Sequence, residues 1–220
     1  MYNLTAADFA DTGQWRLLLK IGEHGLEAFL ENTLHPEIEP QQLCSVKWDA
    51  KRDDLCREIE EAVYNNPRLL DDFATRIILY DPRTLFVPTQ IAEESAGAEA
   101  ELYNKVYIAE ESDVMTDRDS DITAVWSLAP GVKGFLMRSF PGARITCNLM
   151  EKVRELRKTN NRLTVYADIR EDETDFIFLN GKELMSASTH SLPQEEIRPF
   201  IMNLLDVYGY KPEDAEVVIR

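Results

Sequence analysis

One order of predicted elements, three strands followed by a helix and a fourth strand, occurs twice along the chain. The first set starts at Trp15 and the second at Leu163. Apolar residues alternate with polar ones along the strands and recur at helical spacing in the helices. This order predicts a duplicated α/β unit, because each set can form a sheet with a helix packed on it. The two sets share no obvious sequence repeat, so only the pattern is duplicated.

Local signals give the bounds of the predicted elements. In the first set, two strand-like runs flank Glu23-His24-Gly25, a turn that contains glycine. They are followed by a predicted strand at 43–50, a helix between Asp53 and Asn65, and a strand at 76–81. In the second set, Asn180-Gly181 is typical of a type I′ hairpin turn. The second set has predicted strands at 163–169, 175–180 and 183–189, a helix from about Glu195 to Tyr208, and a last strand at 215–220.

The residues between the two sets show a weaker pattern. We expect an acidic segment, Glu110 to Asp121, to be an exposed and mobile loop, because its carboxylates need water or cations around them. The other expected elements are strands at 84–88, 105–110 and 122–128, helices at 90–104, 131–140 and 148–158, and a strand at 143–147. We divide the chain into a first subdomain at 1–130 and a second part at 131–220, which holds connecting helices and the second subdomain.

The charge of the chain limits its partners. Acidic side chains number 40 and basic ones 24, which gives a formal net charge of -16. A polyanion is repelled at long range by such a chain, so nucleic acid is excluded as a partner. Solubility is the simplest explanation of the acidity, and a basic protein partner is the alternative.

Cysteine usage and hydropathy indicate the compartment. Cys44, Cys56 and Cys147 lie far apart, without a C-x-x-C pair, so the sequence predicts neither a disulfide framework nor a zinc ribbon. A reducing cytoplasm fits this usage. No run of 18 apolar residues predicts a membrane span, and residues 1–15 lack the apolar core of a signal peptide. The acidic segment lacks the spacing and the central glycine of an EF-hand, so we predict no metal site there.

Several stretches carry a resemblance to known proteins. They include LLLKIGEHGLEAFL at 17–30, IEEAVYNNPRLL at 59–70, TLFVPTQIAEE at 84–94, AELYNKVY at 100–107, AVWSLAPGVKGFLMRSFPGARIT at 124–146, LTVYADIREDETDFIFLNGKELM at 163–185 and IMNLLDVYGY at 201–210. In this order they resemble an uncharacterised bacterial family of unknown function with an actin-like ATPase (ribonuclease H-like) fold. The resemblance implies an α/β protein with a duplicated fold, in which two mixed-sheet subdomains surround a cleft. It also implies that the turns at Glu23–Gly25 and Arg170–Glu173 face each other across that cleft.

The nucleotide-binding positions of actin-like ATPases are mostly changed. In the first hairpin, the pattern D-x-G-x-T falls on residues 20–24, and only Gly22 matches. Lys20 stands where the resemblance implies an aspartate that holds magnesium through water, and a cation cannot serve a cation.

The second hairpin keeps Asp168, Ile169, Thr174 and Asp175 but replaces the glycines between them with Arg170, Glu171, Asp172 and Glu173. Two like charges about 4 Å apart repel by on the order of 4 kcal/mol at an effective dielectric constant of 20, although Arg170 can offset one of them. The added Cβ atoms also keep a phosphate away from the backbone N–H groups.

These residues favour a non-catalytic role. The sequence predicts no catalytic residue, no metal site and no cofactor, and it leaves Gly22, Asp168 and Thr174 as degenerate cleft positions. The prediction is an interaction or scaffold module in the cytoplasm with an unknown protein partner, and the oligomeric state is left open. One alternative is a divergent nucleotide-binding enzyme, of ATPase or phosphotransferase type, that uses Asp168 and Thr174. Another, based on fold alone, is a component of a polymer or an envelope assembly.

Overall fold

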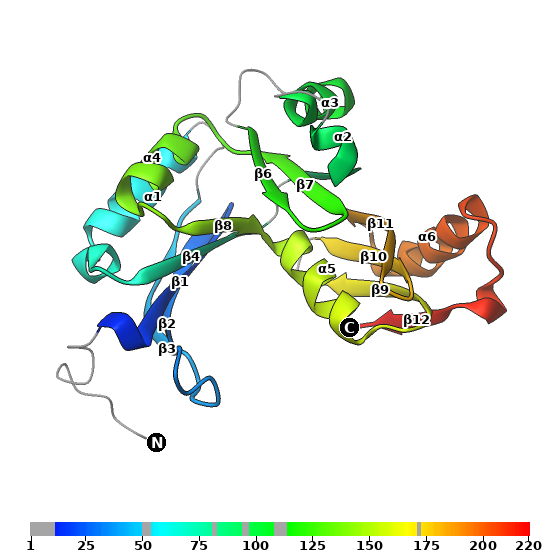
Figure 1. Ribbon diagram of the computed structural model, residues 1–220, viewed down its shortest axis with the longest axis horizontal. Coiled ribbons are helices and arrows are strands. Elements are labelled where there is room, and N and C mark those ends of the chain that lie inside the picture. Colours follow the sequence, from blue (N-terminus) through cyan, green and yellow to red (C-terminus); the bar gives the residue numbers. More distant parts are fainter. Residues whose placement is uncertain (1–11, 50–53, 81–82, 94–96, 108–113, 171–172) are drawn as a thin grey trace.

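The described part of the chain forms three β-sheets with helices packed on them (Figure 1). The structure is a computed structural model, and it describes residues 12–49, 54–80, 83–93, 97–107, 114–170 and 173–220. The first sheet has five strands in the order β3-β2-β1-β4-β8, the second has four in the order β11-β10-β9-β12, and the third has three in the order β5-β7-β6.

The five-stranded sheet contains the first predicted set. β1 (Trp15–Gly22), β2 (Gly25–Asn32) and β3 (Gln41–Lys47) are antiparallel, and β4 (Ala74–Leu79) and β8 (Arg144–Cys147) continue the sheet in parallel to β1. α1 (Leu55–Tyr64) precedes β4 and α4 (Val132–Ser139) precedes β8. Both helices lie on the same side of the sheet (Figure 1). The main hydrophobic core lies between these helices and the strands, and it includes Leu17, Leu19, Ile59, Ile77 and Phe135.

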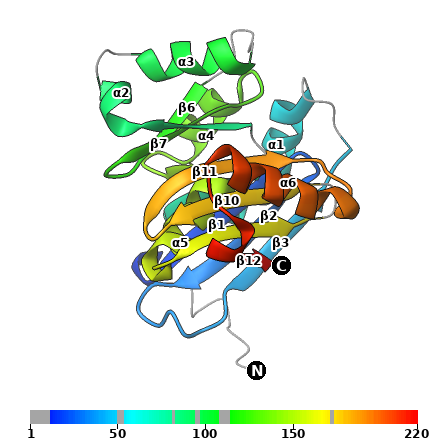
Figure 2. The ribbon, with the colours of Figure 1, turned by 90° about the vertical axis from the view of Figure 1, so that its right-hand side faces the viewer.

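The four-stranded sheet repeats the first four strands of that order. β9 (Leu163–Ile169), β10 (Thr174–Asn180) and β11 (Glu183–His190) form the meander, and β12 (Glu216–Ile219) pairs in parallel with β9. α6 (Gln194–Val207) lies across the outer face of this sheet (Figure 2). Because side chains alternate along a strand, Phe176 and Phe178 pack towards α6, whereas Ile177 and Leu179 join the main core.

The three-stranded sheet is inserted between β4 and α4. It consists of β5 (Thr84–Pro88), β6 (Val114–Arg118) and β7 (Ile122–Ser127), and α2 (Thr89–Glu93) and α3 (Ala98–Tyr107) lie beside it (Figure 1). The single helix predicted at 90–104 is thus two helices. The strand predicted at 105–110 is wrong at 105–107, and 108–110 lie outside the described residues. The helix continues to Tyr107 because this ring packs on Tyr103 one turn earlier, with 4.9 Å between centroids.

The expectation of a mobile loop at the acidic segment is also wrong for its described part. Residues 114–118 form β6, which pairs with β7, and 110–113 lie outside the described residues. The carboxylates of Asp117 and Asp121 are neutralised by arginines of α5 (Asn148–Thr159), the helix that connects β8 to β9. The chain division near residue 130 stays a prediction, although the pairing of β8 with β4 favours a boundary beyond β8.

His190, at the end of β11, gives the native state a dependence on pH. Its ring lies 4.7 Å from that of Phe200 and 6.0 Å from that of Phe176, and burial lowers its pKa below the ordinary value. The unfolded chain therefore takes up a proton near pH 6.5, before the native state does. The contribution of neutral His190 to the free energy of unfolding is therefore fully present above about pH 6.5, and it is lost as pH falls through the lower pKa of the native state.

We expect the melting temperature of the wild type, relative to that of His190→Gln, to fall by on the order of 2 °C between pH 7.5 and pH 5. Calorimetry of both proteins in matched buffers measures this difference. Parallel pH profiles would contradict a role for His190.

Candidate functional site

Charged groups of the two hairpin turns lie close enough to act on each other, whereas a cleft between the turns stays a prediction. Burial raises the pKa of Glu173, which lies in the β9–β10 turn, and the positive charge of Arg170 opposes this rise. Repulsion from Asp175 and from Glu23 of the β1–β2 turn raises the pKa of Glu173 further. The pKa of Tyr80, just after β4, is raised by burial, and its hydroxyl lies near enough to sense both Glu27 of the first hairpin and Arg170 of the second. Charged groups of both hairpins therefore lie near Tyr80 and Glu173.

Asp175 is the centre of this region and is only 1% exposed. Its Oδ1 accepts hydrogen bonds from Arg170 Nη2 at 3.0 Å and from Thr189 Oγ1 at 2.6 Å. Its Oδ2 accepts from Lys152 Nζ at 2.8 Å and from Asn148 Nδ2 at 3.1 Å. We call these five residues the Asp175 cluster. With two donors on each oxygen, the carboxylate is satisfied by the chain itself.

Asp168, one of the predicted cleft positions, is also engaged. It lies opposite Asp175 in the register of β9 and β10, and its carboxylate pairs with Lys152 Nζ. Burial opposes the charge of Lys152, but the hydrogen bonds to Asp168 and Asp175 outweigh burial and raise the pKa of the lysine. Lys152 therefore stays protonated and bridges two carboxylates, which leaves Asp168 poorly suited to act as a general base.

The turn between β9 and β10 is closed by its own residues. Arg170 donates its backbone N–H to the carbonyl oxygen of Glu173 at 2.7 Å, and its Nη2 lies 3.1 Å from the Glu173 carboxylate. The expectation that Arg170 offsets one carboxylate of the turn is therefore confirmed. Thr174 is 1% exposed, at the first position of β10. The guanidinium of Arg170 is thus engaged by Asp175 and Glu173, in the turn where the resemblance implies glycines.

In the first hairpin, Gly22 lines a cavity together with Lys20 and Tyr80. Gly22 is the last residue of β1 and pairs with Gly25. Gly25 is the residue whose lack of a side chain matters, because a Cβ there would lie 2.5 Å from the carbonyl oxygen of Val46. Lys20 Nζ lies 4.9 Å from the centroid of the Phe29 ring, a cation–π contact on the face of the sheet.

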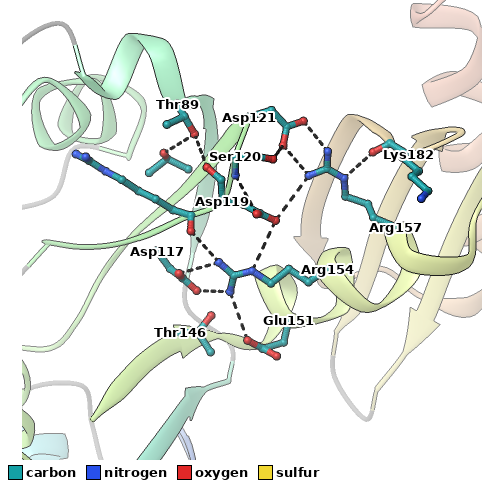
Figure 3. Close-up of polar contacts among 12 residues, drawn as sticks. Thr89, Asp117, Asp119, Ser120, Asp121, Thr146, Glu151, Arg154, Arg157 and Lys182 are labelled. Atoms are coloured by element: carbon teal, nitrogen blue, oxygen red, sulfur yellow. Dashed lines mark hydrogen bonds and ion pairs between the residues drawn. The ribbon is translucent and has the colours of Figure 1, made fainter. Parts of the chain in front are cut away.

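Two arginines of α5 hold the β6–β7 hairpin (Figure 3). Arg154 makes a bidentate contact with Asp117, with Nη1–Oδ2 at 2.5 Å and Nη2–Oδ1 at 2.8 Å, and hydrogen bonding to Asp117 raises the pKa of Arg154. Arg157 makes a second bidentate contact, with Asp121, at 2.9 and 2.5 Å. Its Nε also donates to the carbonyl oxygen of Lys182 at 2.5 Å. Arg157 thus joins the three-stranded sheet to the β10–β11 turn.

A cavity of about 1090 Å³ runs along α5, beside β4 and β8. Tyr80 and Ile78 form part of its wall, and we call the cavity the basic groove because most of its charged side chains are cationic. The cations are Arg76, Arg144, Lys152, Arg154, Arg157, Lys158 and Lys182, and the acidic residues are Asp119, Glu151 and Glu155. The sequence showed these α5 cations only as part of a predicted helix, and their joint placement with Arg76 and Lys182 depends on the fold.

In the ranges that the structure describes, no group of three or more His, Cys, Asp or Glu side chains could hold a metal ion. Among the helices of those same ranges, none is long and apolar enough to cross a membrane.

Comparison with known proteins identifies the fold. A family model described as "Protein of unknown function (DUF3822)" matches residues 5–219. A crystal structure from Bacteroides thetaiotaomicron, of a protein with an actin-like ATPase fold and unknown function, superposes with a TM-score of 0.80 at 17% identity, covering 96% of this chain and 84% of that one. The predicted duplicated actin-like fold, with its mixed sheets in two subdomains, is confirmed by this match.

More distant structures are also similar in part. The cytoplasmic domain of EpsL from the type II secretion system of Vibrio cholerae matches with a TM-score of 0.46 at 8% identity, covering 94% of this chain and 82% of that one. No curated protein sequence matches the chain.

Proposed function

The chain belongs to the DUF3822 family of proteins of unknown function, and from this premise we propose that it is a non-catalytic protein acting as an interaction or scaffold module. One observation carries the proposal: in the turn of the second hairpin, where the resemblance implies glycines that admit a phosphate, the Arg170 guanidinium binds Asp175 and Glu173. We place the protein in the cytoplasm with a protein partner, on the basis of its cysteine usage and charge.

A nucleotide phosphate would have to compete with the chain for the same cations. If the phosphate drew Arg170 away, the Asp175 carboxylate, which is 1% exposed, would lose one of its hydrogen-bond donors. Leaving a buried charged group short of a hydrogen bond costs more than the net gain from a typical new one. Lys20, in contact with Phe29 at the magnesium-supporting position, adds a positive charge where a cation would bind. The fold is therefore kept while its phosphate chemistry is replaced by internal ion pairs.

A divergent nucleotide-binding enzyme, of ATPase or phosphotransferase type, is the alternative. It is favoured by Asp168, which stands at the hairpin end with its side chain 39% exposed. In that case Asp168 would exchange Lys152 for a hydrated magnesium ion. Thr174 would contribute little to the exchange, because it is 1% exposed.

Millimolar ATP with magnesium is expected to leave the melting temperature of the protein unchanged to within about 2 °C. A ligand at about 1,000 times its dissociation constant stabilises the native state by roughly 4 kcal/mol. For a chain of this length, that gain would raise the melting temperature by on the order of 10 °C. Differential scanning fluorimetry at matched ionic strength checks the expectation. A large shift that Asp168→Ala abolishes, and that the exposed control Asp206→Ala keeps, would make the enzyme the better account.

A further inference from the structure

We propose that the basic groove binds an extended acidic segment of a partner protein. This inference rests on the proposed function and gives it a chemistry of recognition. The groove is an exception to the net charge of the chain, which is -16, because seven of its lining side chains are cationic and three are acidic. Cations gathered in one hollow of an acidic protein create a local potential that attracts negative groups.

The cations of the groove differ in how well the chain already neutralises them. Arg154 and Arg157 form the wall next to the β6–β7 hairpin, and each has a bidentate carboxylate partner. Lys158 and Lys182 are exposed, and neither has a carboxylate within ion-pair distance among the described residues. Arg144 is 57% exposed and lies 3.6 Å from its carboxylate partner, Glu151. These three side chains are available to an incoming carboxylate.

Two polar groups of the groove also lack a partner. Arg76 pairs with Glu151 through Nη2, but its Nε is buried without an acceptor among the described residues. The hydroxyl of Tyr80 makes no hydrogen bond within the described part of the chain, and burial raises its pKa, so it remains a neutral donor. A hydroxyl donor beside cations suits a carboxylate, which only accepts hydrogen bonds.

The spacing of the cations favours a chain over a compact anion. Arg144 lies on β8, just before α5 begins at Asn148, and Lys158 lies ten positions beyond Asn148, which is about 15 Å along the helix axis. Alternate side chains of an extended peptide are about 7 Å apart on one side. A peptide with several carboxylates can therefore meet cations along the length of the groove. A single phosphate group would reach one end of it. A nucleic acid would extend beyond the groove and meet the repulsion of the rest of the chain.

The test is binding of a fluorescein-labelled oligoglutamate peptide about ten residues long, which spans about 33 Å when extended. Fluorescence anisotropy is measured at low ionic strength, where exposed charges are screened least. We expect saturable binding to the full chain. The double variant Lys158→Glu, Lys182→Glu should raise the dissociation constant of the peptide by about tenfold. The two substitutions change the charge of the groove by four units, and a few tenths of a kcal/mol for each unit add up to this ratio.

The matched control is Lys105→Glu, Lys211→Glu, which changes the net charge equally at exposed sites outside the groove. Equal weakening by the two double variants would overturn the proposal, because only the total charge would then matter. The absence of binding to the wild type would overturn it too, as would tighter binding of a single-stranded oligonucleotide of the same charge. This outcome is distinct from that of the ATP experiment. If the peptide does not bind and ATP has no effect, the groove proposal fails and the scaffold role remains. If ATP raises the melting temperature, the scaffold role itself fails.

Discussion

Replacing Asp175 by asparagine is expected to lower the free energy of unfolding by about 3 kcal/mol or more, as the loss of one partner from a buried ion pair does. The asparagine keeps the shape of the side chain but has no charge. Its NH2 group can only donate hydrogen bonds, so it would stand against the donors that now bind one of the carboxylate oxygens. Lys152 and Arg170, which are both partly buried, would each lose the Asp175 carboxylate as an ion-pair partner. For a chain of this length, the melting temperature should fall by on the order of 10 °C.

Asp168→Asn is the matched control for this experiment, because Asp168 faces Asp175 across the hairpin and shares Lys152 with it. Its side chain is 39% exposed, so its loss should cost no more than about 1 kcal/mol. Chemical denaturation of the two variants and the wild type gives the comparison. If both substitutions cost the same, or if Asp175→Asn is neutral, Asp175 is not a structural centre of the second hairpin and the case for internal ion pairs in place of a phosphate is lost.

Replacing Arg154 by methionine is expected to cost about 2 to 3 kcal/mol and to loosen the β6–β7 hairpin. Methionine keeps the length and the apolar stem of the side chain but removes the bidentate contact with Asp117. Both partners are largely buried, with side-chain exposures of 15% and 12%, so Asp117 would be left with an uncompensated charge. The hydrogen bond from Arg154 to the carbonyl oxygen of Arg118 would be lost as well.

Hydrogen exchange, read by mass spectrometry, should show faster exchange in β6 and β7 of Arg154→Met, along with a lower melting temperature. Arg154→Lys should restore only part of the loss, because an ammonium group cannot bind both carboxylate oxygens in the planar geometry of a guanidinium. Arg198→Met, on the exposed side of α6, controls for the change of charge. Full rescue by lysine, or unchanged exchange in the hairpin, would contradict the clamp that we assign to Arg154.

Local signals made much of the fold predictable. Asn180-Gly181 specifies a tight turn through its own backbone, with Gly181 at a φ of 57°, and the hairpins predicted there and at Glu23-His24-Gly25 are present. In α1, Ile59, Ala62 and Val63 recur at helical spacing, and all three are buried. Such signals need only neighbouring residues, so they survive without knowledge of the tertiary structure.

The error at the acidic segment and the missed contacts of the second hairpin come from pairing between residues that are distant in the sequence. The acidic segment was expected to be solvated because its counter-ions are not nearby in the sequence, and Arg154 is 37 positions away from Asp117. Likewise, Lys152 reaches Asp175 over 23 positions, so the pattern of the second hairpin alone did not reveal how its carboxylate is satisfied. Asp168 and Thr174 were placed correctly on the hairpin, but their partners on α5 and β11 follow only from the fold.

The position of α5 has a mechanical consequence. Lys152 ties this helix to the second hairpin, while Arg157 ties it both to Asp121 and to the backbone at Lys182. A hinge motion that separated the three-stranded sheet from the β10–β11 turn would have to break one of the two contacts of Arg157. α5 therefore acts as a tie between the three-stranded sheet and the four-stranded sheet, and separating the two would cost contacts of Arg157.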